Sequence, residues 1–79
     1  MSFVEKVLPG ARLFDAGRWF DAHEAWEEHW LAETDGTKRR LLQGLIQIAA
    51  ALHKLHVVQS PLPAASLFAK GLAKLDACP

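Results

Sequence analysis

Apolar residues recur every three to four positions in four stretches of this chain, and this spacing predicts four helices. Breaks that contain glycine, proline, serine or aspartate separate the stretches. No segment shows the strict alternation of apolar and polar residues that marks a half-buried strand. We therefore predict an all-α fold, a single domain over residues 1–79, with helices over residues 1–16, 18–33, 37–58 and 61–77.

The first helix contains a proline, which is tolerated in the first turn but not in a helix interior. Two arrangements satisfy Pro9: a short turn that ends near Leu8 followed by a helix that begins at Pro9, or one helix kinked at this point. Gly17 is expected to end the helix, because glycine adopts the left-handed conformation of a helix C-terminus without strain. The expected apolar face consists of Ala11, Leu13, Phe14 and Ala16.

The third helix is apolar on most sides, which predicts that it lies at the centre of a small antiparallel bundle. We expect Gly44 to permit a close approach of a neighbouring helix, since glycine otherwise destabilises a helix interior by about 1 kcal/mol relative to alanine. The main apolar stripe is expected to consist of Leu41, Leu45, Ile48, Leu52 and Leu55, with Ala49 beside it and Leu42 and Ile46 widening the face.

The breaks on either side of this helix carry capping signals. Asp35 or Thr37 can cap its start, and Gly36 can end the preceding helix. Ser60 followed by Pro61 is a typical helix start. In the last helix we expect Ala64, Leu67, Phe68, Gly71, Leu72 and Leu75 to be buried, and Lys70, Lys74 and Asp76 to face water.

The second helix mixes ionisable groups into an aromatic face. At 100° per residue, His23 and Glu27 lie one turn apart among Trp19, Trp26 and Trp30. Glu24 and Glu28 project to the opposite side, where water solvates them. Because core faces normally exclude ionisable side chains, His23 and Glu27 require partners.

Those partners can be found by counting outward from the short loop near residue 35, since a short loop makes the flanking helices antiparallel neighbours. Glu27 then lies level with Gln43 or Gly44, and His23 with Gln47 or Ile48, so the two glutamines are the polar candidates. We predict a buried or half-buried polar cluster of these four side chains. It is either a hydrogen-bond network that fixes helix register or a small site with Glu27 as base or ligand and His23 as acid or ligand.

A metal ion is a weaker possibility. The run His23-Glu24-x-x-Glu27 is similar to the zinc helix motif His-Glu-x-x-His, with glutamate in place of the second histidine. The remaining candidate ligand, His53, is expected roughly 7–8 Å along the axis from the level of His23. We therefore predict no cofactor, and keep His23, Glu27 and His53 as weak candidates for a divalent metal. A site shared between subunits stays open.

Composition narrows the class of protein. Nine basic residues balance nine acidic ones, whereas a nucleic-acid-binding protein would usually carry a basic surplus. The one basic cluster, residues 38–40, is interpreted as a solvated first helical turn. We expect no membrane span, because Gln43, Gln47 and His53 interrupt the longest apolar run. A single cysteine, Cys78, fits a reducing cytoplasm.

Two blocks of residues resemble a family of small prokaryotic helical proteins known only as a domain of unknown function. The blocks are Phe14-x-x-Gly17-x-x-Phe20-x-x-His23-Glu24-x-Trp26-Glu27-x-x-Trp30 and Leu42-Gln43-Gly44-Leu45-Ile46-Gln47-x-Ala49-Ala50-Ala51-x-His53. The likeness extends from about residue 10 to residue 75. It implies an all-α fold in which the two blocks pack together, with His23, Glu24, Glu27, Gln43, Gln47 and His53 as signature positions. It implies no activity, substrate or cofactor.

No recognisable catalytic set stands out, and half of the residues are apolar. We therefore expect a non-catalytic structural or protein-interaction module that associates with itself through apolar and tryptophan surface. The alternative is a small hydrolase-like enzyme, metal-dependent or acid/base, that uses His23 and Glu27.

Overall fold

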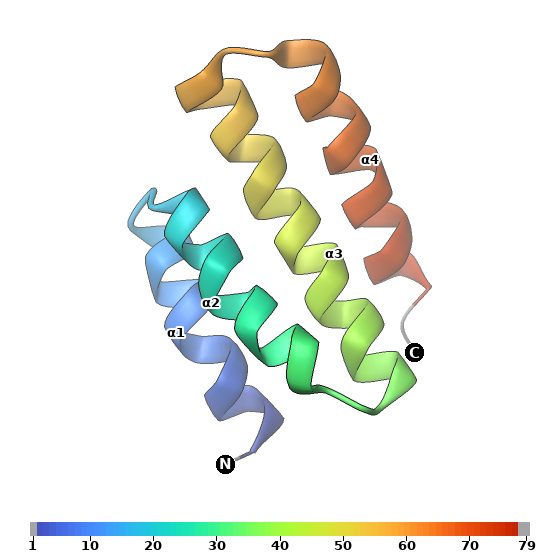
Figure 1. Cartoon of the computed structure of the whole chain (residues 1–79). Helices are drawn as coiled ribbons and strands as arrows, with labels where there is room; N and C mark the ends of the chain where they lie inside the picture. The colour runs from blue at the N-terminus through green and yellow to red at the C-terminus, as the bar shows by residue number, and fades with distance from the viewer. Residues whose placement is uncertain (1, 78–79) are drawn as a thin grey trace.

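The predicted all-α architecture is confirmed by the computed structural model, which describes residues 2–77 and thus leaves Met1, Cys78 and Pro79 outside. Figure 1 shows α2, α3 and α4 side by side, with α3 between the other two and α1 beside α2. In chain order the elements are α1 (Phe3–Asp15), α2 (Trp19–Ala32), α3 (Gly36–His53), a π-helical turn η1 (Lys54–Val58) and α4 (Pro61–Asp76).

Local signals place most of the helix ends correctly. α1 runs unbroken through Pro9, so no separate first turn exists. Gly17 has a φ of 77°, and the amides of Gly17 and Arg18 donate to the carbonyls of Phe14 and Leu13, which is the Schellman arrangement. Ser60 precedes α4 with Pro61 in the first turn, although the serine side chain makes no capping hydrogen bond.

The turn between α2 and α3 differs from the prediction in one respect. Gly36 does not end α2 but begins α3, where the Asp35 side chain accepts a hydrogen bond of 2.9 Å from the Lys38 amide. Arg39 is not a purely solvated member of the basic cluster. Its guanidinium lies 4.3 Å from the centre of the Trp30 ring and donates to the carbonyl oxygens of Trp30 and Glu33. It therefore ties the end of α2 to the start of α3.

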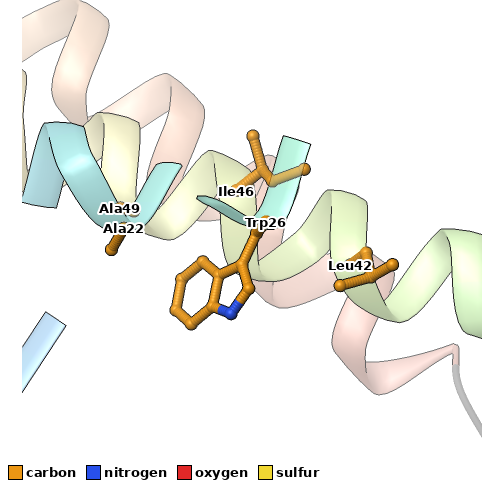
Figure 2. Close-up of a cluster of buried hydrophobic side chains, with 5 residues drawn as sticks. All are labelled: Ala22, Trp26, Leu42, Ile46 and Ala49. Atoms are coloured by element: carbon orange, nitrogen blue, oxygen red, sulfur yellow. The ribbon is translucent and has the colours of Figure 1, made fainter. Parts of the chain in front are cut away.

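The core between α2 and α3 is built around one tryptophan. Trp26 is 3% exposed, and its indole Nε1 donates a 3.0 Å hydrogen bond to the Val7 carbonyl of α1. Gly10 of α1 lies directly against the ring, since a Cβ at that position would overlap it. Figure 2 shows the cluster that surrounds the indole: Ala22 and Trp26 from α2, with Leu42, Ile46 and Ala49 from α3.

This core corrects the expected stripe of α3. Leu42 and Ile46, predicted only to widen the apolar face, are its buried centre, and Leu55 is 44% exposed. Leu41, Leu45, Ile48 and Leu52 are half-buried. Ala16, which directly follows α1, is exposed, although it was predicted to belong to the apolar face of that helix. Because α3 is apolar around most of its circumference, spacing alone could not identify the side that meets α2.

The other side of α3 meets α4 through two glycines, as expected for Gly44. A Cβ on Gly44 would lie 3.0 Å from the carbonyl oxygen of Gly71, and one on Gly71 would lie 2.8 Å from the carbonyl oxygen of Gly44. Of the predicted buried residues of α4, Phe68 and Leu72 are instead 40% and 46% exposed. The two backbones therefore approach closely at this contact, with the Ile48 and Leu75 side chains packed against the glycines.

By length and hydropathy alone, one stretch could cross a membrane: Gly36–Val58, with a mean hydropathy of 1.3. The absence of a membrane span, predicted from the polar interruptions in this stretch, stays a prediction. The criterion is weak for a single helix, because the core helix of a compact protein also meets it. Here the stretch forms α3 and η1 and packs against both α2 and α4.

We predict that Gly71→Ala destabilises the protein by about 1–2 kcal/mol, although alanine is the better helix former. The added methyl group meets backbone and the Ile48 side chain, neither of which can move away freely. Gly36→Ala is the matched control, because a Cβ there has no neighbour within 4 Å. Urea unfolding measures both variants, and equal stability of the two would contradict the close contact.

Candidate functional site

His23 and Glu27 form a contact on one face of α2. Their Nε2 and Oε2 atoms are 3.2 Å apart, as the one-turn spacing allows. The two side chains are 24% and 45% exposed, so the pair lies at the surface rather than in the core. In residues 2–77 no polar or charged residue is fully buried. The pair is thus accessible to a ligand or to water.

Glu27 also borders the hollow that contains the two glutamines. This cavity of about 210 Å³ is lined by Glu27, Trp30, Gln43, Ile46 and Gln47. Within the described residues no hydrogen bond joins the His23–Glu27 pair to either amide. The structure therefore brings three of the four predicted side chains around one space without linking them into a network.

Gln47 finds its partner on α4. Its Oε1 accepts a 2.8 Å hydrogen bond from the Lys74 ammonium, a contact between residues 27 positions apart in the chain. Lys74 was predicted to face water and is half-buried instead. Counting levels from the α2–α3 loop considered only those two helices, so it missed this residue. The signal available in the sequence was Gly44, which marks the side of α3 that another helix approaches.

The histidines are placed among aromatic rings. The Phe20 ring lies 5.7 Å from the His23 ring and 5.1 Å from the His53 ring, measured between centroids. The Trp19 and His56 rings stack at 4.9 Å, a pairing that the sequence did not reveal. The Nδ1 atom of His23 is buried and has no hydrogen-bond partner. His53 of α3 and His56 of η1 thus each contact an aromatic ring of α2, although His56 stays exposed.

The three weak metal candidates are not assembled into a ligand set. Within the described range 2–77, no three histidine, cysteine, aspartate or glutamate side chains converge on a point that could hold an ion. His23 and Glu27 are in contact. His53 contacts the neighbouring Phe20 ring and does not complete a set of three ligands with them. Two ligands are fewer than a protein zinc site normally provides.

The sequence pattern did not predict one further feature of the surface. An uncharged groove of about 340 Å³ runs between α3 and α4 and is lined by Ala51, Leu52, Leu55, Pro61, Ala64, Ala65 and Phe68. Two large side chains of this lining, Leu55 and Phe68, are 44% and 40% exposed. Other exposed large apolar side chains lie elsewhere on η1 and α4: Val57, Val58, Leu62 and Leu72. We call the groove together with these side chains the apolar face. Leu52, Leu55, Ala64, Phe68 and Leu72 were expected to be buried, so their periodicity could not reveal that the described chain leaves this face open.

A comparison with family models gives a match. Residues 7–60 match the model of a family described as Domain of unknown function (DUF309). The chain belongs to the DUF309 family. The DUF309 match includes the His23–Glu27 pair, both glutamines, His53 and most of α1, and it ends before α4. A comparison with curated proteins gives no match.

We predict that Glu27→Gln changes the free energy of unfolding by less than about 1 kcal/mol. A partly exposed ion pair within one helix contributes little, because water screens it and holding two side chains costs entropy. Urea denaturation of the variant beside Glu28→Gln, a solvated neighbour, measures the difference. A loss of several kcal/mol specific to Glu27 would indicate a structural network instead of an accessible pair.

Proposed function

We propose that this DUF309 protein is a non-catalytic protein-interaction module that binds its partner through the apolar face. The observation that carries the proposal is the uncharged groove between α3 and α4 with its border of exposed large side chains. Monomeric soluble proteins rarely expose contiguous apolar patches beyond a few hundred Å², and such patches commonly mark binding surfaces.

The contacts of the tryptophans revise the expectation that tryptophan surface forms the interface. Trp26 is buried, Trp30 packs under Arg39, and Trp19 stacks on His56. These contacts lie within the chain, so the tryptophans leave less surface for a partner. The exposed leucines, valines and phenylalanine of η1 and α4 supply the apolar contact area instead. A cytoplasmic location, and the absence of nucleic-acid and membrane partners, remain predictions.

One observation favours a second candidate, a small acid/base hydrolase-like enzyme. His23 and Glu27 are in contact, accessible and next to hollows on both sides of α2. A carboxylate beside an imidazole can orient it as a general base. If this candidate holds, hydrolysis of an activated ester falls in both His23→Ala and Glu27→Gln but not in His29→Ala. Equal rates in all three variants would exclude it.

The interaction proposal predicts that a photoactivatable benzoylphenylalanine in place of Phe68 forms covalent adducts of discrete mass in cells. Phe68 borders the groove and is 40% exposed, so a bound protein lies within reach of the new side chain. The same residue placed at Arg12, which is exposed on α1, serves as the control. Gel electrophoresis and mass spectrometry read out the adducts. Position 68 giving no more adduct than position 12 would contradict the proposal.

A further inference from the structure

We infer that the partner of the apolar face is a second copy of this chain, docked so that the α3–α4 surfaces of two copies pack on each other. The inference rests on the proposed function, since it names the occupant of the same surface. Three observations support it: the shape of the face, the placement of charge around it and its extent.

The shape of the face is self-complementary. Ala51, Ala64 and Ala65 contribute small side chains to the groove, whose lining also includes the 40% exposed Phe68. Leu72, one turn further along α4, is 46% exposed, and we take Phe68 and Leu72 together as a ridge beside the groove. A two-fold axis through such a surface places the ridge of each copy over the groove of the other. Each copy then supplies both a ridge and the groove that receives the ridge of its partner.

α4 has only one neighbouring helix within the described chain. It packs on α3 and touches η1, but it does not contact α1 or α2. Its buried residues are Ala64 and Gly71, whereas Leu62, Ala65, Phe68 and Leu72 are exposed at intervals of three and four. This spacing is the apolar stripe of a helix that packs on two sides. A paired α3–α4 surface would complete a four-helix arrangement.

The distribution of charge leaves the apolar face neutral. Seven of the nine acidic residues lie between positions 15 and 35, in or next to α2, and six of the nine basic residues follow position 35. α2 lies on the opposite side of α3 from α4 (Figure 1). Stacking two apolar faces therefore does not bring the acidic α2 helices together. The groove lining carries no charge that would select a charged partner.

The extent of the face is sufficient for a dimer. α4 has 16 residues, which corresponds to about 24 Å of helix, and two helices side by side are about 20 Å wide. Such a surface presents of the order of 500 Å² on each copy, or about 1,000 Å² in total, which reaches the lower end of specific interfaces. We therefore expect a reversible dimer and not a permanent one.

Sedimentation equilibrium of the purified chain over a range of concentrations tests the inference. The mass is expected to rise with concentration from the 8.7 kDa of one chain to twice that value. Phe68→Asp and Leu72→Asp each place a charge in the interface and are expected to weaken dimerisation by about 100-fold. Ser66→Asp is the matched control, because Ser66 is exposed on α4 about 200° around the helix from Phe68.

Two further measurements keep the result interpretable. Circular dichroism establishes that each variant is folded, and hydrogen exchange of the unaltered chain supplies a readout that needs no variant. Peptides from α4 are expected to gain protection as concentration rises, and peptides from α1 are not. The dimer is also expected to persist in 0.5 M NaCl, since apolar burial is not screened by salt, whereas an association of α2 with the basic residues would dissociate.

The outcomes separate this inference from the proposed function. A chain that stays monomeric at millimolar concentration overturns the inference that the partner is a second copy. Adducts with a protein of another mass from position 68 would then still support the proposed protein-binding face. A dimer that both aspartate variants leave intact also overturns the inference, because the interface must then lie elsewhere. A monomer that forms no adduct from position 68 overturns both.

Discussion

α3 must satisfy two neighbours of different character on opposite sides, and the rest of the molecule depends on how it does so. Toward α2 it presents Leu42, Ile46 and Ala49, which surround the large Trp26 side chain. Toward α4 it presents Gly44, and the two backbones approach closely. The first contact surrounds a bulky side chain, whereas the second is centred on two glycines with Ile48 and Leu75 packed beside them. The large side chains of α4 consequently project beside the contact, and this is the origin of the apolar face.

The same constraint decides where the polar groups lie. Gln43 and Gln47 belong to the part of α3 between its two neighbours, so they line a surface hollow and do not enter the core. Gln47 turns to Lys74 of α4, while Glu27 stays with His23 on α2. Two short polar contacts thus replace the continuous network that spacing suggested. Each contact lies near solvent, where hydrogen bonds to water can replace it at a low cost in free energy.

How much could be predicted from the sequence depended on the range of each interaction. Gly17 and Asp35 act through hydrogen bonds between residues no more than five positions apart, so the C-terminal end of α1 and the start of α3 were predictable. The choice between Leu41 and Leu42 as the buried stripe was not, because both continue an apolar series. The pairing of Gln47 with Lys74 required the placement of a third helix. Gly44 indicated that a helix approaches closely there, but only the docked structure shows that Gly71 of α4 is its counterpart.

The position of α3 also bears on the order in which the chain acquires structure. α2 and α3 are joined by a short turn that Arg39 closes, and their contact holds the largest buried side chains. α1 attaches mainly to α2, and α4 only to α3 and η1. Apart from a small contact between α1 and α3, the contacts join helices that follow one another along the chain, which is the topology of rapid folding. The hairpin of α2 and α3 is therefore the natural nucleus, and the outer helices are the units able to detach from it while the centre remains folded.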